Sequence, residues 1–233
     1  MRSNMPRSLV MVALLAIAGL LAGASTSMAQ GVDVSRVHSL ATYTFLNADP
    51  QTYVADEGKV TDVEDGSISL IRRDDVTITL SASADTCTHV DGLPATLQNL
   101  VMGQDVTVVS DATGTQALSI RAGHPKIKRG EPGCGLFRGA VHGDITDTMS
   151  DGSTLERSWD RGAITGLAAG WIRILRGDDV VVVSHPTSDT RVIGTSAYWR
   201  LRLGENVTIV SIKQMDTQGV VTLVAARIRL HRH

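Results

Sequence analysis

Aromatic residues are scarce in this chain of 233 residues, because three Trp, three Tyr and two Phe make up only 3% of it. So few rings form a poor stacking track for nucleic-acid bases. A surplus of positive charge is also missing, since 22 basic residues stand against 24 acidic ones. The chain therefore lacks the basic composition of a nucleic-acid-binding protein, and we do not expect nucleic acid as a partner.

Long apolar runs are absent from the chain after its beginning. The run Leu9 to Ala22 is shorter than the roughly 20 residues that a membrane-spanning helix needs. Arg2 and Arg7 precede this run, and the small-residue ending Ser27-Met28-Ala29 follows it. This pattern predicts that residues 1–29 are a secretory signal peptide. We expect a mature protein without a membrane span that is exported to the periplasm or secreted.

Only two cysteines occur, Cys87 and Cys134. An even number of cysteines in an exported protein predicts a disulfide between them, and two free thiols are the alternative. The only short spacings that resemble metal sites are Cys87-Thr-His89 and His231-Arg-His233, and neither approaches a four-ligand zinc pattern. The sequence predicts no metal site and no cofactor.

Motifs of catalysis are missing as well. The chain has no Gly-x-Ser-x-Gly nucleophile elbow and no Gly-rich phosphate loop. The paired carboxylates Asp74-Asp75 and Asp178-Asp179 fall in corresponding hairpins, where aspartate favours turn geometry. The segment beginning at Asp147 resembles a calcium loop but lacks its bidentate glutamate. We therefore assign no catalytic residue.

The chain does contain a repeat, because the pattern of Gly58 to Arg121 returns from Gly162 to Arg229. The openings align without a gap: Gly58, Thr61, Gly66, Ile68, Arg72, Asp74, Asp75 and Val76 recur as Gly162, Thr165, Gly170, Ile172, Arg176, Asp178, Asp179 and Val180. Such self-similarity indicates one small fold used twice.

Apolar residues alternate with polar ones inside each repeat, as in Ile68-Ser-Leu70 and Val76-Thr-Ile78-Thr-Leu80. This period of two is typical of half-buried antiparallel strands. Five short strands with a longer excursion before the fourth predict an all-β protein of two tandem, small, five-stranded OB-like barrels. Two small β-sandwiches are the alternative.

The repeat divides the chain into five segments. We predict a signal peptide at 1–29, a lead-in segment at 30–57, a first barrel at 58–123, a Gly- and Pro-punctuated connector at 124–160 and a second barrel at 161–233. Within the connector, Arg138-Gly-Ala-Val141 is similar to Arg161-Gly-Ala-Ile164. The connector is therefore either a fragment of a further repeat or a hairpin that extends one barrel.

The pattern also resembles a known family. The residues that carry the resemblance are Gly-x-Val, Gly-x-Ile-x-Leu and Val-x-Ile, followed by Leu100-x-x-Gly103-x-x-Val106-x-Val108 and Ala117-x-x-Ile120. They resemble a bacterial exported domain of unknown function that is often present in tandem and is OB-like in fold. The resemblance covers about two thirds of the mature chain and implies a fold, but it implies no activity.

The two repeats differ in charge and in aromatic content. Residues 58–123 hold 4 basic and 9 acidic residues (net −5) and no aromatic residue, whereas 161–233 hold 10 and 5 (net +5). OB barrels commonly bind ligands across a strand face. We predict a ligand-binding surface on the second repeat, made of Trp171, Arg173, Tyr198, Arg200 and Arg202.

These observations predict an exported, non-enzymatic binding or envelope-associated module. An anionic glycan or an acidic protein is the expected partner. Three alternatives stay open at this point: an enzyme of unrecognised type, a structural subunit of an envelope assembly, and docking of the acidic repeat against the basic one, which would bury the arginines.

Overall fold

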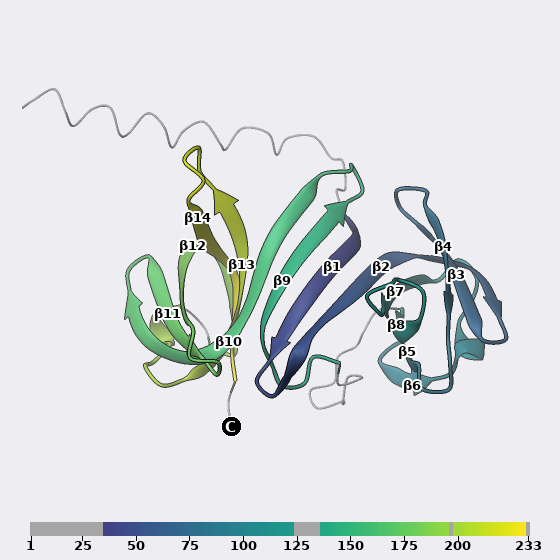
Figure 1. The fold of residues 1–233 in the computed structure, drawn as a ribbon, viewed down its shortest axis with the longest axis horizontal. Helices are drawn as coiled ribbons and strands as arrows, with labels where there is room; N and C mark the ends of the chain where they lie inside the picture. The colour runs from purple at the N-terminus through teal and green to yellow at the C-terminus, as the bar shows by residue number, and fades with distance from the viewer. Residues whose placement is uncertain (1–34, 124–135, 196–197, 232–233) are drawn as a thin grey trace, which may run out of the picture. The chain divides into compact units, whose positions relative to one another are not determined.

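The computed structural model describes residues 35–123, 136–195 and 198–231, and these residues form one sheet of 14 strands (Figure 1). The all-β prediction is confirmed. The first repeat contains β1 (Arg36–Phe45), β2 (Ala48–Glu64), β3 (Ser67–Arg72), β4 (Thr77–Ser81), β5 (Cys87–Val90), β6 (Leu93–Ala95), the 3₁₀ helix η1 (Leu97–Asn99), β7 (Asp105–Ser110) and β8 (Ala117–Ala122). The second contains β9 (Ala140–Met149), β10 (Thr154–Ala168), β11 (Trp171–Arg176), β12 (Val181–Ile193), the 3₁₀ helix η2 (Tyr198–Arg200), β13 (Asn206–Met215) and β14 (Val221–Leu230).

Strand pairing closes a ring of five strands in the second repeat. β10 pairs with β11 and β13, β11 pairs with β12, β13 pairs with β14, and a parallel pairing of β12 with β14 completes the ring. In the first repeat β2 pairs with β3 and β7, β3 pairs with β4, and β8 pairs with β7 and in parallel with β5. Between β4 and β8 the circuit is completed only by the bridge of Ser81 with Gln116, just before β8. A β-sandwich consists of two separate sheets that face each other. The strands described here belong to one sheet, which does not fit the alternative of two β-sandwiches.

The predicted equivalence of the repeats is confirmed by strand register. Gly58 pairs with both Arg72 and Val106. Gly162 pairs in the same way with Arg176 and with Val207. The two repeats therefore share this register, although the first has β4 and β5 in place of the continuous β12 and also contains β6.

Each ring has its own apolar core. Ile68 and Leu70 of β3 are fully buried in the first core, and their equivalents Ile172 and Ile174 of β11 are fully buried in the second. Because successive side chains of a strand point to opposite faces, the residues between them point outward. The core therefore fixes which residues of each strand can meet a ligand.

The lead-in and the connector turn out to be equivalent parts of the two repeats. β1 pairs with β2 as a hairpin, and β9 pairs with β10 in the same way. β9 begins 104 residues after β1 (140 minus 36), which is also the spacing of the repeated glycines (162 minus 58). The connector thus supplies the first hairpin of the second repeat and is not a fragment of a third.

The predicted boundaries need correction for the same reason. The boundaries between 57 and 58 and between 160 and 161 fall inside β2 and β10, because these strands continue from the first hairpin into the ring. Among the described residues, the repeats begin at Arg36 and Ala140 instead. A fragment that starts at residue 161 would lack the first half of β10.

The two repeats are joined by antiparallel pairing of β1 with β9, which lie side by side in Figure 1. Ala41 stands opposite Ile145, its own equivalent 104 residues later (145 minus 41), so the pairing is centred on a pseudo-two-fold axis. Such self-complementary contact is the arrangement of a two-fold dimer, here within one chain.

The two ends of this join have different chemistry. At one end Ser39 Oγ donates a hydrogen bond of 2.6 Å to Asp147, whose side chain is buried. At the other end the ring of Tyr43 lies on Gly143, where an added Cβ would come within 2.6 Å of the ring. The centroid of the Phe137 ring lies 4.5 Å from that of Tyr43. A polar contact and an aromatic contact therefore flank one pseudo-symmetric pairing.

Residues 1–29 lie outside the described residues, so the signal peptide and export stay predictions. In the part of the chain that the structure describes, no helix has the length and apolar character needed to cross a membrane.

Candidate ligand-binding surface

A histidine, an arginine and two aspartates form an ionic network in the first repeat. His38 Nδ1 lies 2.8 Å from Asp56 Oδ1, and Arg72 donates a hydrogen bond of 2.9 Å to the same oxygen. Arg72 also donates to both carboxylate oxygens of Asp74, at 3.0 and 2.6 Å. Because Asp56 is only 4% exposed, these contacts compensate a buried charge and tie β1, β2 and β3 together.

The same network recurs in the second repeat at positions 104 residues later. His142 Nδ1 lies 2.8 Å from Asp160 Oδ1, and Arg176 donates to this oxygen at 3.1 Å and to Asp178. An additional carboxylate, Asp144, lies 3.2 Å from His142 Nε2. The recurrence in both repeats and the burial of the central aspartates lead us to assign these networks to folding rather than to catalysis.

The turn interpretation of the paired aspartates is confirmed. Asp75 and Asp179 adopt φ values of 61° and 63°, the left-handed conformation that aspartate tolerates in tight turns. Their neighbours Asp74 and Asp178 accept hydrogen bonds from the arginines at the start of each turn. Both pairs therefore shape hairpins.

The second network predicts a dependence of stability on pH. The hydrogen bond to Asp160 raises the pKa of His142 above its ordinary value of about 6.5. Stabilisation by the charged imidazole is therefore fully present below about pH 6.5 and is lost as the pH rises through the raised pKa. We expect the difference in unfolding free energy between wild type and His142→Gln to shrink as the pH rises above about 6.5 in urea titrations. A difference that stays constant over this range would contradict this role.

Trp171 and Arg173 point outward from β11, as predicted. Arg173 is exposed, and its guanidinium carbon lies 6.0 Å from the centroid of the Trp171 ring. Arg173 also donates a hydrogen bond of 3.2 Å to the carbonyl of Thr165. Gly166 makes room for the indole, because a Cβ there would lie 2.7 Å from it. The tryptophan and the arginine are thus held side by side on the outer face of the ring.

Three residues of β12 complete this face. Val183 stands opposite Arg173, and Val181 stands opposite Leu175. These aliphatic side chains are well exposed, with 42% of Val183, 56% of Val181 and 37% of Leu175 accessible. His185 continues the same alternation and is also exposed. We call the six residues Trp171, Arg173, Leu175, Val181, Val183 and His185 the β11–β12 face.

The first repeat has a different composition at the equivalent positions. They are Ser67, Ser69, Ile71, Thr77, Thr79 and Ser81, each 104 residues earlier (171 minus 67). Ser69 and Thr79 form a hydrogen bond of 2.7 Å across the strands. The first repeat therefore has a hydroxyl side chain at five of the six positions, and Ile71 is aliphatic like its equivalent Leu175.

The aliphatic part of the β11–β12 face was not predicted. A signal for it exists in the sequence, because the gapless alignment sets Val181 and Val183 against Thr77 and Thr79. An apolar residue that replaces a polar one at an outward position is unexpected for folding alone. Comparison of the two repeats position by position would have identified these residues.

The other predicted surface residues, Tyr198, Arg200 and Arg202, do not lie on a strand. Tyr198–Arg200 is a 3₁₀ helix, and after it Leu201 is 2% exposed whereas Leu203 is 67% exposed. The Tyr198 hydroxyl donates a hydrogen bond of 2.6 Å to the carbonyl of Trp171 and so supports that strand end. Arg200 and Arg202 are exposed. The structure thus brings Tyr198 to the backbone of Trp171, whereas no contact of Arg200 or Arg202 with Trp171 or Arg173 is seen among the described residues.

The predicted disulfide cannot be placed, because Cys134 lies outside the described residues. Cys87 begins β5, and its sulfur lies 3.7 Å from Nδ1 of His89. The pairing of Cys87 with Cys134 stays a prediction.

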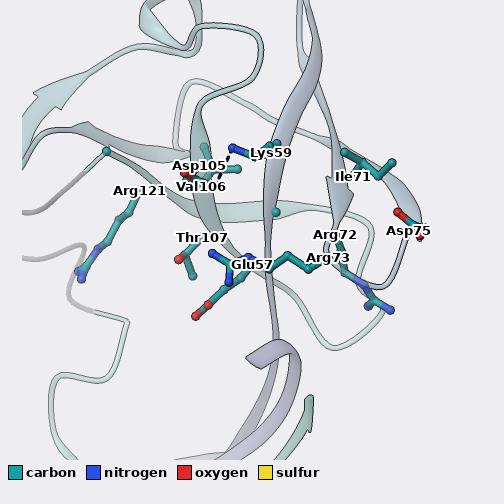
Figure 2. A pocket seen from close by; sticks show the side chains of 12 residues that line it. Glu57, Lys59, Ile71, Arg72, Arg73, Asp75, Asp105, Val106, Thr107 and Arg121 are labelled. Atoms are coloured by element: carbon teal, nitrogen blue, oxygen red, sulfur yellow. Dashed lines mark ion pairs between the residues drawn. The ribbon is translucent and has the colours of Figure 1, made fainter. Parts of the chain in front are cut away.

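A polar hollow of about 320 Å³ lies on the first repeat (Figure 2). In this view Glu57 and Thr107 lie between Arg121 on one side and Arg73 on the other. Lys59 forms an ion pair of 3.3 Å with Asp105 along its wall. Basic and acidic side chains both line this hollow, and we assign it no ligand.

The chain was also compared with known proteins. Neither the models of known protein families nor the curated proteins give a match in sequence.

Proposed function

We propose that this chain is an exported, non-enzymatic binding protein, related to the tandem OB-like exported domains that it resembles. Its second repeat binds an acidic protein partner on the β11–β12 face. The observation that carries the proposal is the contrast between this face and its hydroxyl-rich equivalent in the first repeat. A face needed only for folding would have no reason to differ in this way.

The composition of the face favours a protein partner over a glycan. Interfaces are enriched in Trp and Arg, and these residues are frequent hot spots of binding energy. Val181, Val183 and Leu175 add exposed aliphatic surface, which a protein buries readily. The single indole is already flanked by Arg173 and by the backbone at Gly166, so it offers little free ring for a sugar.

The charge of the face favours an acidic partner. Arg173 provides a positive charge, and no residue of the β11–β12 face is acidic. The second repeat as a whole carries a net charge of +5 (10 basic and 5 acidic residues in 161–233). Complementary charge increases the association rate and the specificity of a complex more than its bulk affinity.

The experiment replaces part of the face with the residues of the first repeat. Mature protein with Trp171→Ser, Arg173→Ser and Val183→Thr is immobilised beside wild type, and proteins retained from the native envelope fraction are compared. We expect wild type to retain a partner that the triple variant loses by at least about tenfold, because hot spots of this kind contribute more than 1 kcal/mol each. Retention should also weaken as salt increases.

A matched control changes the equivalent face of the first repeat. Ser69→Ala with Thr79→Ala should leave retention unchanged. Equal retention by wild type and the triple variant, with both folded by circular dichroism, would refute the proposed face.

A further inference from the structure

Four arginines lie on a second outer surface of the second repeat, which we call the arginine surface. Arg161 belongs to β10, Arg191 to β12, and Arg227 and Arg229 to β14, and all four are exposed. None of them belongs to the β11–β12 face.

Strand register brings these arginines together. Arg191 stands directly opposite Arg227 in the parallel pairing of β12 with β14. Thr208 of β13 stands between Arg161 and Arg229, as a partner of both. Neighbouring strands are about 4.8 Å apart, and residues two apart on one strand are separated by about 6.8 Å. The four guanidinium groups therefore arise from one compact area of the sheet.

This arrangement is unfavourable for folding by itself. Like charges directly opposite each other on neighbouring strands are destabilising. Within the described part of the chain, no ion pair with a carboxylate is found for any of the four arginines. An unfavourable local choice without compensation in the fold is expected at functional sites.

The first repeat lacks the arginine surface. Cys87 stands opposite Ser119 in β5 and β8, where the second repeat has Arg191 opposite Arg227. Glu57 occupies the position of Arg161, 104 residues earlier (161 minus 57). Arg121 stands opposite Thr107 as Arg229 stands opposite Thr208, so arginine recurs at that one position. Topology does not require arginine at the other three.

An aromatic ring lies in the same lateral row. Trp159 of β10 stands opposite Val210 of β13, which stands opposite Arg227 of β14, which in turn stands opposite Arg191. Trp159 is half-buried. The row thus runs across four strands from an indole to two guanidinium groups.

We propose that the arginine surface binds an anionic polysaccharide that bears carboxylates. Each guanidinium fits a carboxylate through two parallel hydrogen bonds, and several adjacent arginines suit a polymer with regularly repeated charges. Trp159 is half-buried with its ring edge-on to Tyr43, 6.0 Å between centroids, and its accessible part adds apolar surface beside the charges. The apolar content of the row is otherwise limited to Val210, which is too little for the buried centre of a protein interface.

The test uses the full mature chain and polygalacturonate, a polymer of uronic acid, as the probe. We expect wild type to bind polygalacturonate at low salt and to bind neutral dextran at least about tenfold more weakly, because dextran offers no carboxylate. Arg191→Ser with Arg227→Ser should weaken binding about a hundredfold, at roughly tenfold for each charge-assisted contact. Arg73→Ser with Arg121→Ser removes the same charge from exposed positions of the first repeat and should weaken binding by less than about threefold.

Thermal unfolding and a second polymer complete the test. The Arg191→Ser, Arg227→Ser variant should melt at a temperature equal to or higher than wild type, because two opposed charges are removed. A lower melting temperature would assign the arginines a structural role and overturn the proposal. Polyglutamate binding as tight as that of polygalacturonate, or an equal loss in the control variant, would also overturn it. The protein-partner proposal would survive each of these results, because its face is separate.

Discussion

Replacement of Gly162 by alanine is expected to lower the free energy of unfolding by about 3 kcal/mol. Gly162 pairs with Arg176 on one side and with Val207 on the other. A Cβ at this position would lie 2.7 Å from the carbonyl carbon of Leu175 and 3.0 Å from the Cα of Arg176. Because these neighbours are backbone atoms inside a paired sheet, they cannot rotate away, and the strands must separate.

Urea denaturation measures this cost, and two further glycines provide the comparison. Gly58→Ala should cost a similar amount, because its Cβ would lie 2.9 Å from the carbonyl carbon of Ile71. At Gly152 no atom lies within 4 Å of an added Cβ, and only the φ of +80° disfavours a side chain. Gly152→Ala should therefore cost about 1 kcal/mol. A cost for Gly162→Ala no greater than that for Gly152→Ala would show that close approach of the backbone does not explain the repeated glycine.

Replacement of Asp160 by alanine is expected to cost about 3 to 5 kcal/mol. Asp160 is 1% exposed, and it accepts a hydrogen bond from Arg176, whose side chain is 9% exposed. Removal of the carboxylate leaves a buried guanidinium with Asp178 as its remaining acidic partner among the described residues. It also removes the contact between His142 and Asp160. The penalty of an uncompensated buried charge exceeds the loss of any exposed ion pair.

Asp178→Ala is the matched control, because it removes the other carboxylate on the same arginine. The Asp178 side chain is 23% exposed, so water can replace it and the cost should be about 1 kcal/mol. Asp56→Ala tests the equivalent position of the first repeat and should cost nearly as much as Asp160→Ala. Equal costs for Asp160→Ala and Asp178→Ala would contradict the burial argument.

The ring of each repeat could be predicted from sequence because its signals are local. Alternation such as Ile68-Ser-Leu70 predicts a strand, and Gly66 and Gly170 mark turns at equivalent positions. The outward direction of Trp171 and Arg173 follows from the same alternation. Because the pattern occurs twice, each strand and turn is indicated by two stretches of the sequence.

The first hairpin of each repeat could not be predicted in this way. Val37-His38 and Val141-His142 are equivalent, but too few residues are shared to be conspicuous beside a connector rich in glycine. Asp56, the partner of His38, lies 18 residues further along the chain and comes next to it only when β1 pairs with β2. The residues next to His38 in the sequence therefore give no indication of this contact.

The arginine surface was missed for a related reason. Arg191 and Arg227 are far apart in sequence and meet through a parallel pairing, which no turn signal announces. Net charge indicated that the second repeat is basic but did not indicate where the charges gather. Register across four strands decides this, and register is a property of the closed ring.

The central claim, that the second repeat and not the first carries a protein-binding face, is tested most directly by photo-crosslinking in the native organism. A photoreactive residue is placed at Val183 in one strain and at the equivalent Thr79 in another, in the full chain. The account predicts a discrete protein adduct from position 183 and none from position 79, and it predicts that Arg173→Ser weakens the adduct. Equal adducts from both positions, or an adduct from position 79 alone, would contradict it.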